Sequence, residues 1–134
     1  DAYIHSNGTV GSLVEVFCET DFVARNPLFK EFVHDIALHI AAMNPLYLSL
    51  DEIPLELWST EKVRFQEETD KLNKPTDIRE NIVEGKLKSH FGALSLLSQP
   101  FVKDQDKTVG DYINEAVGKF GENMKIGKFV RFEV

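Results

Sequence analysis

One cysteine and a group of carboxylates near residue 20 are the first side chains in this sequence that could do chemistry. Cys18 could act as a nucleophile if a histidine lay beside it in space. Its alternation with Val14 and Val16 instead predicts a buried thiol on a β-strand. Three acidic side chains at even spacings could share one face of an extended strand, but nothing else suggests the cleft that a glycosidase needs: Glu15, Glu19 and Asp21.

The histidines give no metal or catalytic pattern. His34 and His39 lie five positions apart, whereas two zinc ligands on one helix face lie four apart in the HExxH pattern. His39 follows Asp35 on the same expected helix, and we interpret the two as a surface polar pair. Gly8 and Gly11 do not form a phosphate-binding loop. The sequence therefore predicts a protein that is not an enzyme, with no cofactor and no bound metal.

Composition limits the partners that the chain can have. Its 134 residues are 43% hydrophobic and 28% charged, which suits one globular domain over residues 1–134. The net charge of −7 disfavours direct contact with nucleic acid, because no basic patch offsets repulsion by phosphates. Apolar runs are short and interrupted by charges, so we expect no membrane-spanning segment. The single cysteine excludes an internal disulfide and suits a reducing compartment.

Turn and alternation signals predict a small antiparallel sheet that would position these residues. Asn7-Gly8 separates two β-rich segments and is typical of a type I′ hairpin turn. In the second segment the side chains of Val14, Val16 and Cys18 face one way and the glutamates face the other, as expected where one sheet face is buried. The last residues alternate in the same manner and predict a third strand, through Val130, Phe132 and Val134.

Helical signals fill the middle of the chain. Asn26-Pro27 begins a long helix and Asn44-Pro45 ends it. Its apolar stripe consists of Phe29, Phe32, Val33, Ile36, Ile40 and Met43.

Further helices are expected over residues 49–52, over about 55–72 around Leu55 and Phe65, and from residue 75 onward through Ile78. Gly85 in the last of these predicts close helix packing. Residues 103–107 are expected to form a polar connection, and Thr108 caps a final helix that ends at Gly121. The order of strand, strand, helices and strand predicts the α+β class, with a small antiparallel sheet covered by helices.

The segment 20–25, between the second strand and the long helix, places apolar side chains in a short connector. Phe22 either folds back over the core or protrudes as an anchor for a partner, oriented by Asp21 and Arg25. The residues alone leave both interpretations open.

Residues 18–26, with the sequence Cys-Glu-Thr-Asp-Phe-Val-Ala-Arg-Asn, resemble the signature of the translation elongation factor Ts family. Further segments resemble the family in the family's order: residues 3–5 and 10–16, residues 35–45, and then residues 82–86, 99–102 and 129–133. The resemblance covers nearly the whole chain.

This resemblance implies guanine nucleotide exchange on the GTPase elongation factor Tu. In the family the signature segment enters the GTPase near its magnesium and phosphate site, and GDP leaves. Carried over, Phe22 would be the wedge, with Asp21 beside it and Arg25 flanking it, while Thr20 and Val23 would shape the tip. The alternative is an interaction or scaffold domain of the same fold that binds without exchange.

Other features of the resemblance concern the extent of the chain and its assembly. The sequence opens at Asp1 without a methionine, a signal peptide or the small N-terminal helical domain of the family, so we interpret it as a segment of a longer protein. Phe17 and Thr9 stand where the family often has asparagine and arginine. Short members of the family pair two chains, which implies a homodimer through the face or edge of the sheet. The expected location is the bacterial cytoplasm or an organelle of bacterial descent.

Overall fold

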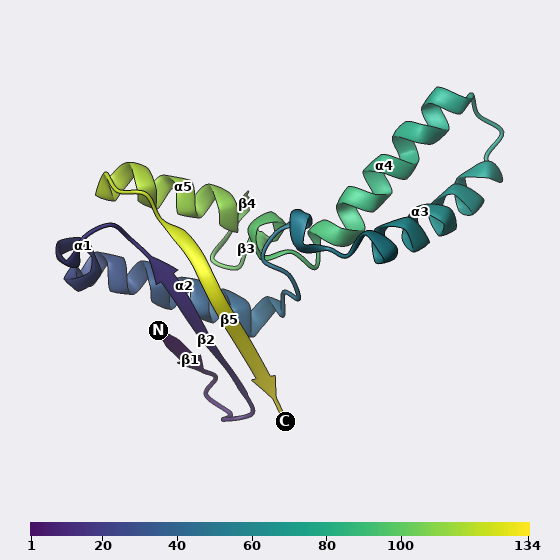
Figure 1. The fold of residues 1–134 in the computed structure, drawn as a ribbon. Helices are drawn as coiled ribbons and strands as arrows, with labels where there is room; N and C mark the ends of the chain where they lie inside the picture. The colour runs from purple at the N-terminus through teal and green to yellow at the C-terminus, as the bar shows by residue number, and fades with distance from the viewer.

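The computed structural model describes all residues from 1 to 134 and divides the molecule into a body and an arm (Figure 1). The body contains β1 (Ala2–Ile4), β2 (Val10–Phe17), α1 (Asp21–Arg25), α2 (Pro27–Met43), β3 (Pro100–Phe101), β4 (Asp104–Thr108), α5 (Val109–Phe120) and β5 (Lys125–Glu133). The arm is a helical hairpin of α3 (Leu55–Asp70) and α4 (Thr76–Gly92). Two short 3₁₀ helices, η1 (Leu50–Glu52) and η2 (Leu96–Ser98), lie where the arm joins the body. None of the helices combines the length and the apolar character needed to span a bilayer.

The sheet of the body is antiparallel with strand order β1-β2-β5, which confirms the α+β class. The hairpin predicted between β1 and β2 is confirmed, but its type I′ turn is wrong: Gly8 has a φ of +71°, whereas Asn7 has no positive φ, and a longer turn is closed by the His5 N–H bond to the Val10 carbonyl. Strand β2 lies in the centre of the sheet and pairs with β5, the strand farthest from it in sequence. Helix α2 covers one face of this sheet (Figure 1).

The alternation predicted for β2 is present, but the apolar alternation predicted for β5 faces the other way. Val14 is buried against α2, while Val16 and Cys18 are half-buried beside the same core. On β5 the register pairs Leu13 with Val130, so both side chains lie on the open face of the sheet. Phe132 and Val134 are also exposed there, whereas Arg131 turns inward and its Nε donates to the Ala41 carbonyl at 2.9 Å.

Helix α2 supplies the centre of the main core. Asn26 caps its start by accepting a hydrogen bond from the Leu28 N–H at 2.9 Å, and Asn44 ends it with a φ of 47°. The predicted stripe is buried except for Met43, which lies at the end of the helix and is partly exposed. The main core consists of Val14, Phe29, Phe32, Val33, Ile36, Ala37, Ile40, Leu96, Phe101, Val109, Ile113, Ala116 and Ile126.

The segment before α5 differs from the predicted polar connection, whereas the helix predicted after Thr108 is confirmed. Residues 103–107 are not a plain connection, because β3 and β4 pair there as a short antiparallel hairpin. Thr108 then begins α5 with a capping box, in which its side chain and that of Asp111 bond to each other's backbone N–H at 3.1 and 3.0 Å. Gly121 ends the helix with a φ of +69°.

The arm has a small core of its own. Phe65 from α3 packs with four other buried side chains, and Trp58 stacks on Phe91 with ring centroids 4.8 Å apart. Leu55 and Ile78 are exposed, whereas Phe65 is buried, so the apolar faces predicted for these two helices are only partly confirmed. The expectation that Gly85 allows close helix packing is wrong, because that glycine is exposed and nothing lies within 4 Å of where its Cβ would stand.

Candidate functional site

The segment 20–25 is a short helix rather than an irregular connector. Helix α1 begins after Thr20, whose hydroxyl accepts a hydrogen bond from the Val23 N–H at 3.4 Å. At its other end the Asn26 N–H donates to the Val23 carbonyl at 3.0 Å. Asn26 therefore ends α1 with its backbone and begins α2 with its side chain. Five residues are too few to carry the periodic pattern by which a helix is detected in sequence.

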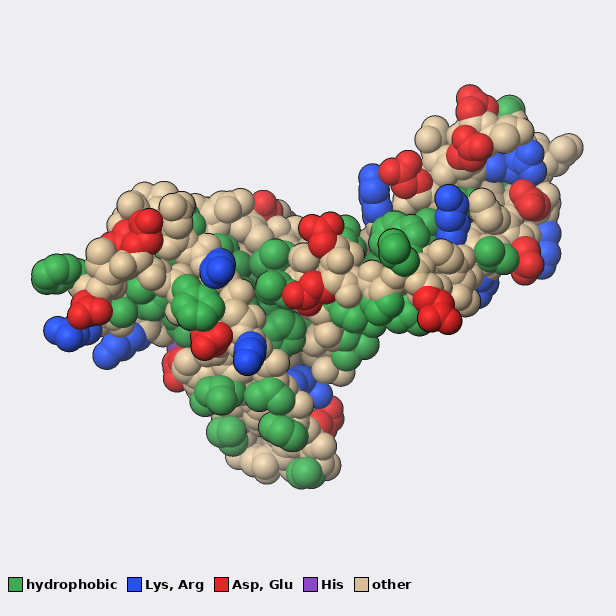
Figure 2. Space-filling view, viewed as in Figure 1, with side chains coloured by type: hydrophobic (Ala, Val, Ile, Leu, Met, Phe, Trp, Pro, Cys, Tyr) green, Lys and Arg blue, Asp and Glu red, His purple; other side chains and the backbone are tan.

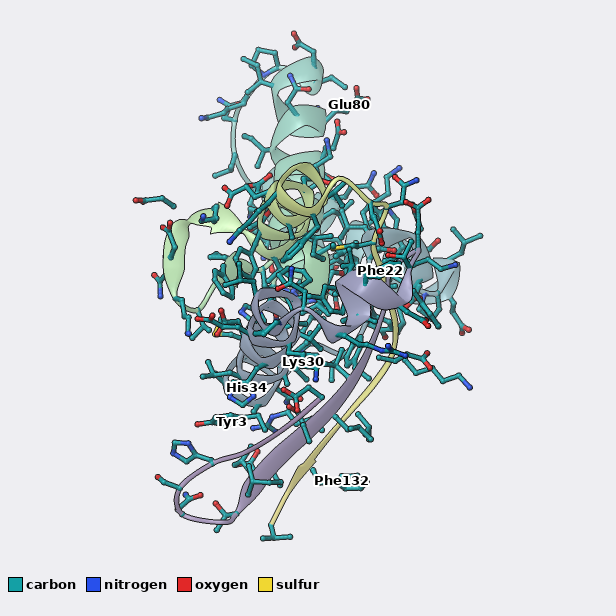
Figure 3. All side chains as sticks on the ribbon, turned by 90° about the vertical axis from the view of Figure 1, so that its left-hand side faces the viewer. Tyr3, Phe22, Lys30, His34, Glu80 and Phe132 are labelled. Atoms are coloured by element: carbon teal, nitrogen blue, oxygen red, sulfur yellow. The ribbon has the colours of Figure 1, made fainter.

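Phe22 protrudes from α1 instead of folding back over the core. Its side chain is 88% exposed, the most exposed aromatic residue of the chain. Figure 3 shows it on the side of the molecule turned toward the viewer, well away from Glu80 on the arm and Phe132 on β5. Its neighbour Val23 is half-buried against the main core and fastens α1 to the body. The helix thus presents one large apolar side chain to solvent and anchors itself with the other.

Charged side chains flank Phe22 on the same turn. Asp21 and Arg25 approach to 3.6 Å at the i, i+4 spacing, and both side chains are more than four-fifths exposed. A pair this exposed contributes little to stability, since water screens it. Both groups are therefore free to reorient toward a partner at little cost.

A residue that sequence reasoning missed holds the start of α1. The carboxylate of Glu122 accepts hydrogen bonds from the Glu19 N–H and the Thr20 N–H, both at 3.0 Å, and from the Thr20 hydroxyl at 2.6 Å. In return the Glu19 carboxylate accepts from the Asn123 N–H at 3.1 Å. The Thr20 hydroxyl is the main cause that holds the pKa of the Glu122 carboxyl below its ordinary value. No pattern in the sequence links Glu122 to a segment about a hundred positions away.

The side chains considered for catalysis or metal binding lie apart from one another. Cys18 is half-buried just after β2, and its Sγ donates to the Thr20 carbonyl at 3.5 Å. His34 lies at the surface and its Nδ1 is 3.1 Å from an Asp1 carboxylate oxygen. No group of three or more histidine, cysteine, aspartate or glutamate side chains is arranged to hold a metal ion.

His39 and Asp35 do not form the surface pair that the sequence suggested. His39 is completely buried; its Nδ1 accepts from the Val102 N–H at 3.1 Å and its Nε2 donates to Gln99 Oε1 at 2.9 Å. Burial lowers the pKa of His39, so the imidazole is neutral at neutral pH. Asp35 turns to other partners, Lys103 Nζ at 2.6 Å and the Tyr112 hydroxyl at 2.9 Å. The two side chains therefore bind different partners, although they lie four residues apart on the same helix.

Burial is also the main cause that raises the pKa of Tyr112 well above its usual range, so this hydroxyl stays a hydrogen-bond donor to Asp35. Both residues line a cavity of about 240 Å³ between α2 and α5, which also includes Leu28 and Phe120. Of its polar groups, Asp35 is paired with Tyr112 and Lys103, and Glu115 is paired with Lys107. The exposed Phe22 makes α1 the candidate site.

Comparison with known proteins gives the family of this chain. Residues 1–134 match the family described as Elongation factor TS. Elongation factor Ts of Rubrobacter xylanophilus is 50% identical over 134 residues, which are 100% of this chain and 69% of that relative. The Geobacter sulfurreducens protein of the same name is 47% identical over 131 residues, 98% of this chain and 61% of the relative. That of Acetivibrio thermocellus is 49% identical over 133 residues, 99% of this chain and 62% of the relative. The chain thus spans 61 to 69% of the length of these relatives, and it belongs to the elongation factor Ts family.

Proposed function

We propose that this chain is the part of an elongation factor Ts that binds elongation factor Tu and promotes release of its GDP. The observation that carries the proposal is the 88% exposure of Phe22 on a helix capped at both ends. A large aromatic side chain held out in water is an unfavourable arrangement for a free protein and a favourable one for a binding anchor. Because α1 is already folded, little conformational entropy is lost when Phe22 enters a partner.

The proposed action is linkage between two binding events, without the making or breaking of a covalent bond. If insertion of α1 weakens the binding of GDP by some factor, bound GDP must weaken the binding of this chain by the same factor. Such a device needs an apolar wedge and a firm support, which Phe22 and Val23 provide. It needs no general base, and Asp21 would act by bringing a carboxylate near the phosphate and magnesium site. Thr20 and Arg25 would hold and flank the tip.

The test is the rate at which a fluorescent GDP analogue leaves purified elongation factor Tu. Phe22→Ala is expected to reduce the acceleration about 100-fold, in the range of a central interface anchor. The matched control is Leu55→Ala, which shortens an equally exposed apolar side chain on the arm. Full acceleration by Phe22→Ala would contradict the proposed wedge.

The same experiment separates the alternative function. If the folded wild-type chain binds elongation factor Tu and leaves the release rate unchanged, the chain is an interaction or scaffold domain of this fold. Binding is measured by calorimetry on the nucleotide-free and the GDP-bound GTPase. Exchange requires tighter binding to the nucleotide-free form, whereas a scaffold binds both forms alike.

The open face of the sheet supports a second proposed partner, another copy of this chain. Figure 2 shows hydrophobic side chains gathered over the lower part of the body, where the sheet lies. Gly11 stands between Ile4 and Phe132 in the strand register, and its lack of a side chain lets Ile4 lie across it. The exposed apolar side chains of this face are Ile4, Leu13, Val130, Phe132 and Val134. A contiguous apolar face of this kind is typical of an interface.

Sedimentation velocity tests the homodimer directly. The wild type is expected to sediment as a dimer at micromolar concentration, and Phe132→Asp as a monomer, because the new carboxylate would be buried without a partner. Glu133→Gln is the control, since it removes a charge from the opposite face of β5, where Glu133 pairs with Arg131. A wild-type monomer across the concentration range would refute the homodimer.

We further propose that residues 1–134 act as one core domain, in the bacterial cytoplasm or an organelle of bacterial descent.

A further inference from the structure

We propose that Glu122 is a positioning residue for α1: together with Glu19 it forms a reciprocal clamp that fixes the direction in which Phe22 points. The inference rests on the proposed function of α1 as the exchange wedge. It assigns a role in that function to a side chain from the other end of the chain, which does not belong to the wedge itself.

The clamp continues the sheet beyond the point where the backbone ladder stops. The last pair of the β2–β5 ladder is Phe17 with Lys125. Past this pair, the side chain of Glu122 bonds to the Glu19 and Thr20 N–H groups, and the side chain of Glu19 bonds to the Asn123 N–H. Two carboxylates therefore replace backbone carbonyls as acceptors and tie the segment before α1 to the segment before β5. Hydrogen bonds from N–H groups to carboxylates are stronger than those to neutral acceptors.

The clamp is coupled to the cap of α1 through a single hydroxyl. The Thr20 hydroxyl has one hydrogen, and it donates that hydrogen to Glu122 at 2.6 Å. Its oxygen then accepts the Val23 N–H at 3.4 Å, the bond that begins α1. Donation to a carboxylate polarises a hydroxyl and makes its oxygen a better acceptor. Removal of the Glu122 carboxylate should therefore loosen the helix as well as the segment before it.

Helix α1 depends on such supports because it is so short. An isolated helix of this length does not persist in water, since nucleation costs more than one turn of hydrogen bonds returns. The Thr20 cap, the packing of Val23, the Asn26 junction and the exposed Asp21–Arg25 pair hold it. Without the clamp, Phe22 would sample several directions, and that freedom would have to be lost again on binding.

The bonds of Glu122 point into the protein, which distinguishes positioning from direct contact. The side chain is half-buried, both of its oxygens are occupied by the segment 19–20, and its place is fixed by Gly121 at the end of α5. Its effect on a partner must therefore pass through α1 and Phe22.

The first measurement compares GDP release from elongation factor Tu by the wild type, Glu122→Gln and Glu122→Ala. Glu122→Ala is expected to lower the acceleration about tenfold, the effect of lost pre-organisation of a binding segment. The acceleration by Glu122→Gln should lie between those of the wild type and Glu122→Ala, because its amide oxygen can still accept from the Glu19 and Thr20 N–H groups. The control is Glu115→Gln, which removes a carboxylate charge on α5 outside the clamp. Wild-type activity in Glu122→Ala would overturn the proposal.

The same substitution in a Phe22→Ala background distinguishes positioning from a general loss of structure. If Glu122 acts through Phe22, adding Glu122→Ala to Phe22→Ala should produce no further loss. Equal losses in both backgrounds would show that Glu122 touches the partner or supports the whole fold, and would overturn the proposal.

Amide hydrogen exchange tests the clamp independently of any exchange activity. In Glu122→Ala the amides of Glu19, Thr20 and Val23 should exchange at least about tenfold faster, while the amides of α2 keep their rates. If the wild type does not accelerate GDP release from elongation factor Tu, the proposed function fails. Amide exchange still shows whether the clamp forms. Unchanged protection at those three amides would refute the clamp, whatever the activity.

Discussion

Replacing His39 with leucine is expected to remove a pH dependence of stability that the wild-type chain should show just below neutral pH. His39 is fully buried, stacks near Phe101 with ring centroids 5.9 Å apart, and uses both ring nitrogens in hydrogen bonds. Because Nδ1 accepts from the Val102 N–H, the proton of the neutral ring sits on Nε2 and is donated to Gln99. A second proton would place a donor against the Val102 N–H and a charge in the core.

The size of the effect at pH 7 follows from these two bonds. Leucine is apolar and of comparable size, so it fills much of the space, but it leaves the Val102 N–H and the side-chain Oε1 of Gln99 without their partner. Each unsatisfied buried group costs about 1 to 3 kcal/mol. The free energy of unfolding of His39→Leu should thus be lower by about 2 to 6 kcal/mol, a large part of the total for a domain of this size.

The direction of the pH effect follows from burial, which lowers the pKa of His39 in the folded chain. In the unfolded chain the group titrates near its ordinary value of about 6.5, so below that pH the unfolded state binds the extra proton first. Stability should therefore fall as the pH drops through this region, by up to about 1.4 kcal/mol per pH unit, until the folded-state pKa is passed. Above about pH 7.5 this contribution is constant.

The assay is urea unfolding followed by circular dichroism at pH 7.5, 6.5 and 5.5. The wild type and the control His34→Gln, which replaces a surface histidine, should both lose stability toward pH 5.5. His39→Leu should be less stable than both at pH 7.5, but with a flatter dependence on pH. Most carboxylates titrate below this window and do not interfere. A slope in His39→Leu as steep as that of the wild type would refute the assignment of His39 as the buried neutral group.

Three further substitutions test the arm and α5. Gly85→Ala should stabilise the chain by about 0.5 to 1 kcal/mol in urea unfolding, because the position is an exposed helix interior with open space around it; destabilisation would mean that the site is crowded. Thr108→Ala should lower stability by about 1 kcal/mol by removing the capping box, with Thr108→Ser as the conservative control. Phe65→Ala should cost about 3 to 5 kcal/mol within the arm. Fluorescence of Trp58, the only tryptophan, should then report unfolding of the arm at lower urea than the circular dichroism of the whole chain.

Most of the fold could be predicted because its strong signals are local. Asn7-Gly8, Asn26-Pro27 and the cap at Thr108 each determine a boundary from neighbouring residues alone, and the structure confirms all three. The prediction for β5 was wrong because a segment distant in sequence determines which way its side chains face. The apolar residues of β5 face outward because pairing with β2 sets their side, and an alternating pattern cannot say which face is covered.

In the candidate site, too, neighbouring residues determined what could be predicted and distant residues determined what could not. The position of Phe22 between a strand and a capped helix could be predicted, but its exposure could not, because the same residues permit folding inward. His39 was misplaced since Asp35 is its neighbour in sequence, whereas Gln99 and Val102 are its neighbours in space. Glu122 could not be found at all, because its partners lie about a hundred positions away.

The junctions of α1 determine how a partner could move it. Asn26 ends α1 with its backbone and begins α2 with its side chain, so no flexible residue separates the two helices. Thr20 is fixed at the other end by the Glu122 carboxylate. Phe22 is therefore connected through α1 to Glu122, Asn26 and the half-buried Val23, and a tilt of α1 would disturb these contacts. If α1 is the wedge proposed above, these supports favour displacement of elements of the GTPase over a rearrangement of α1 itself.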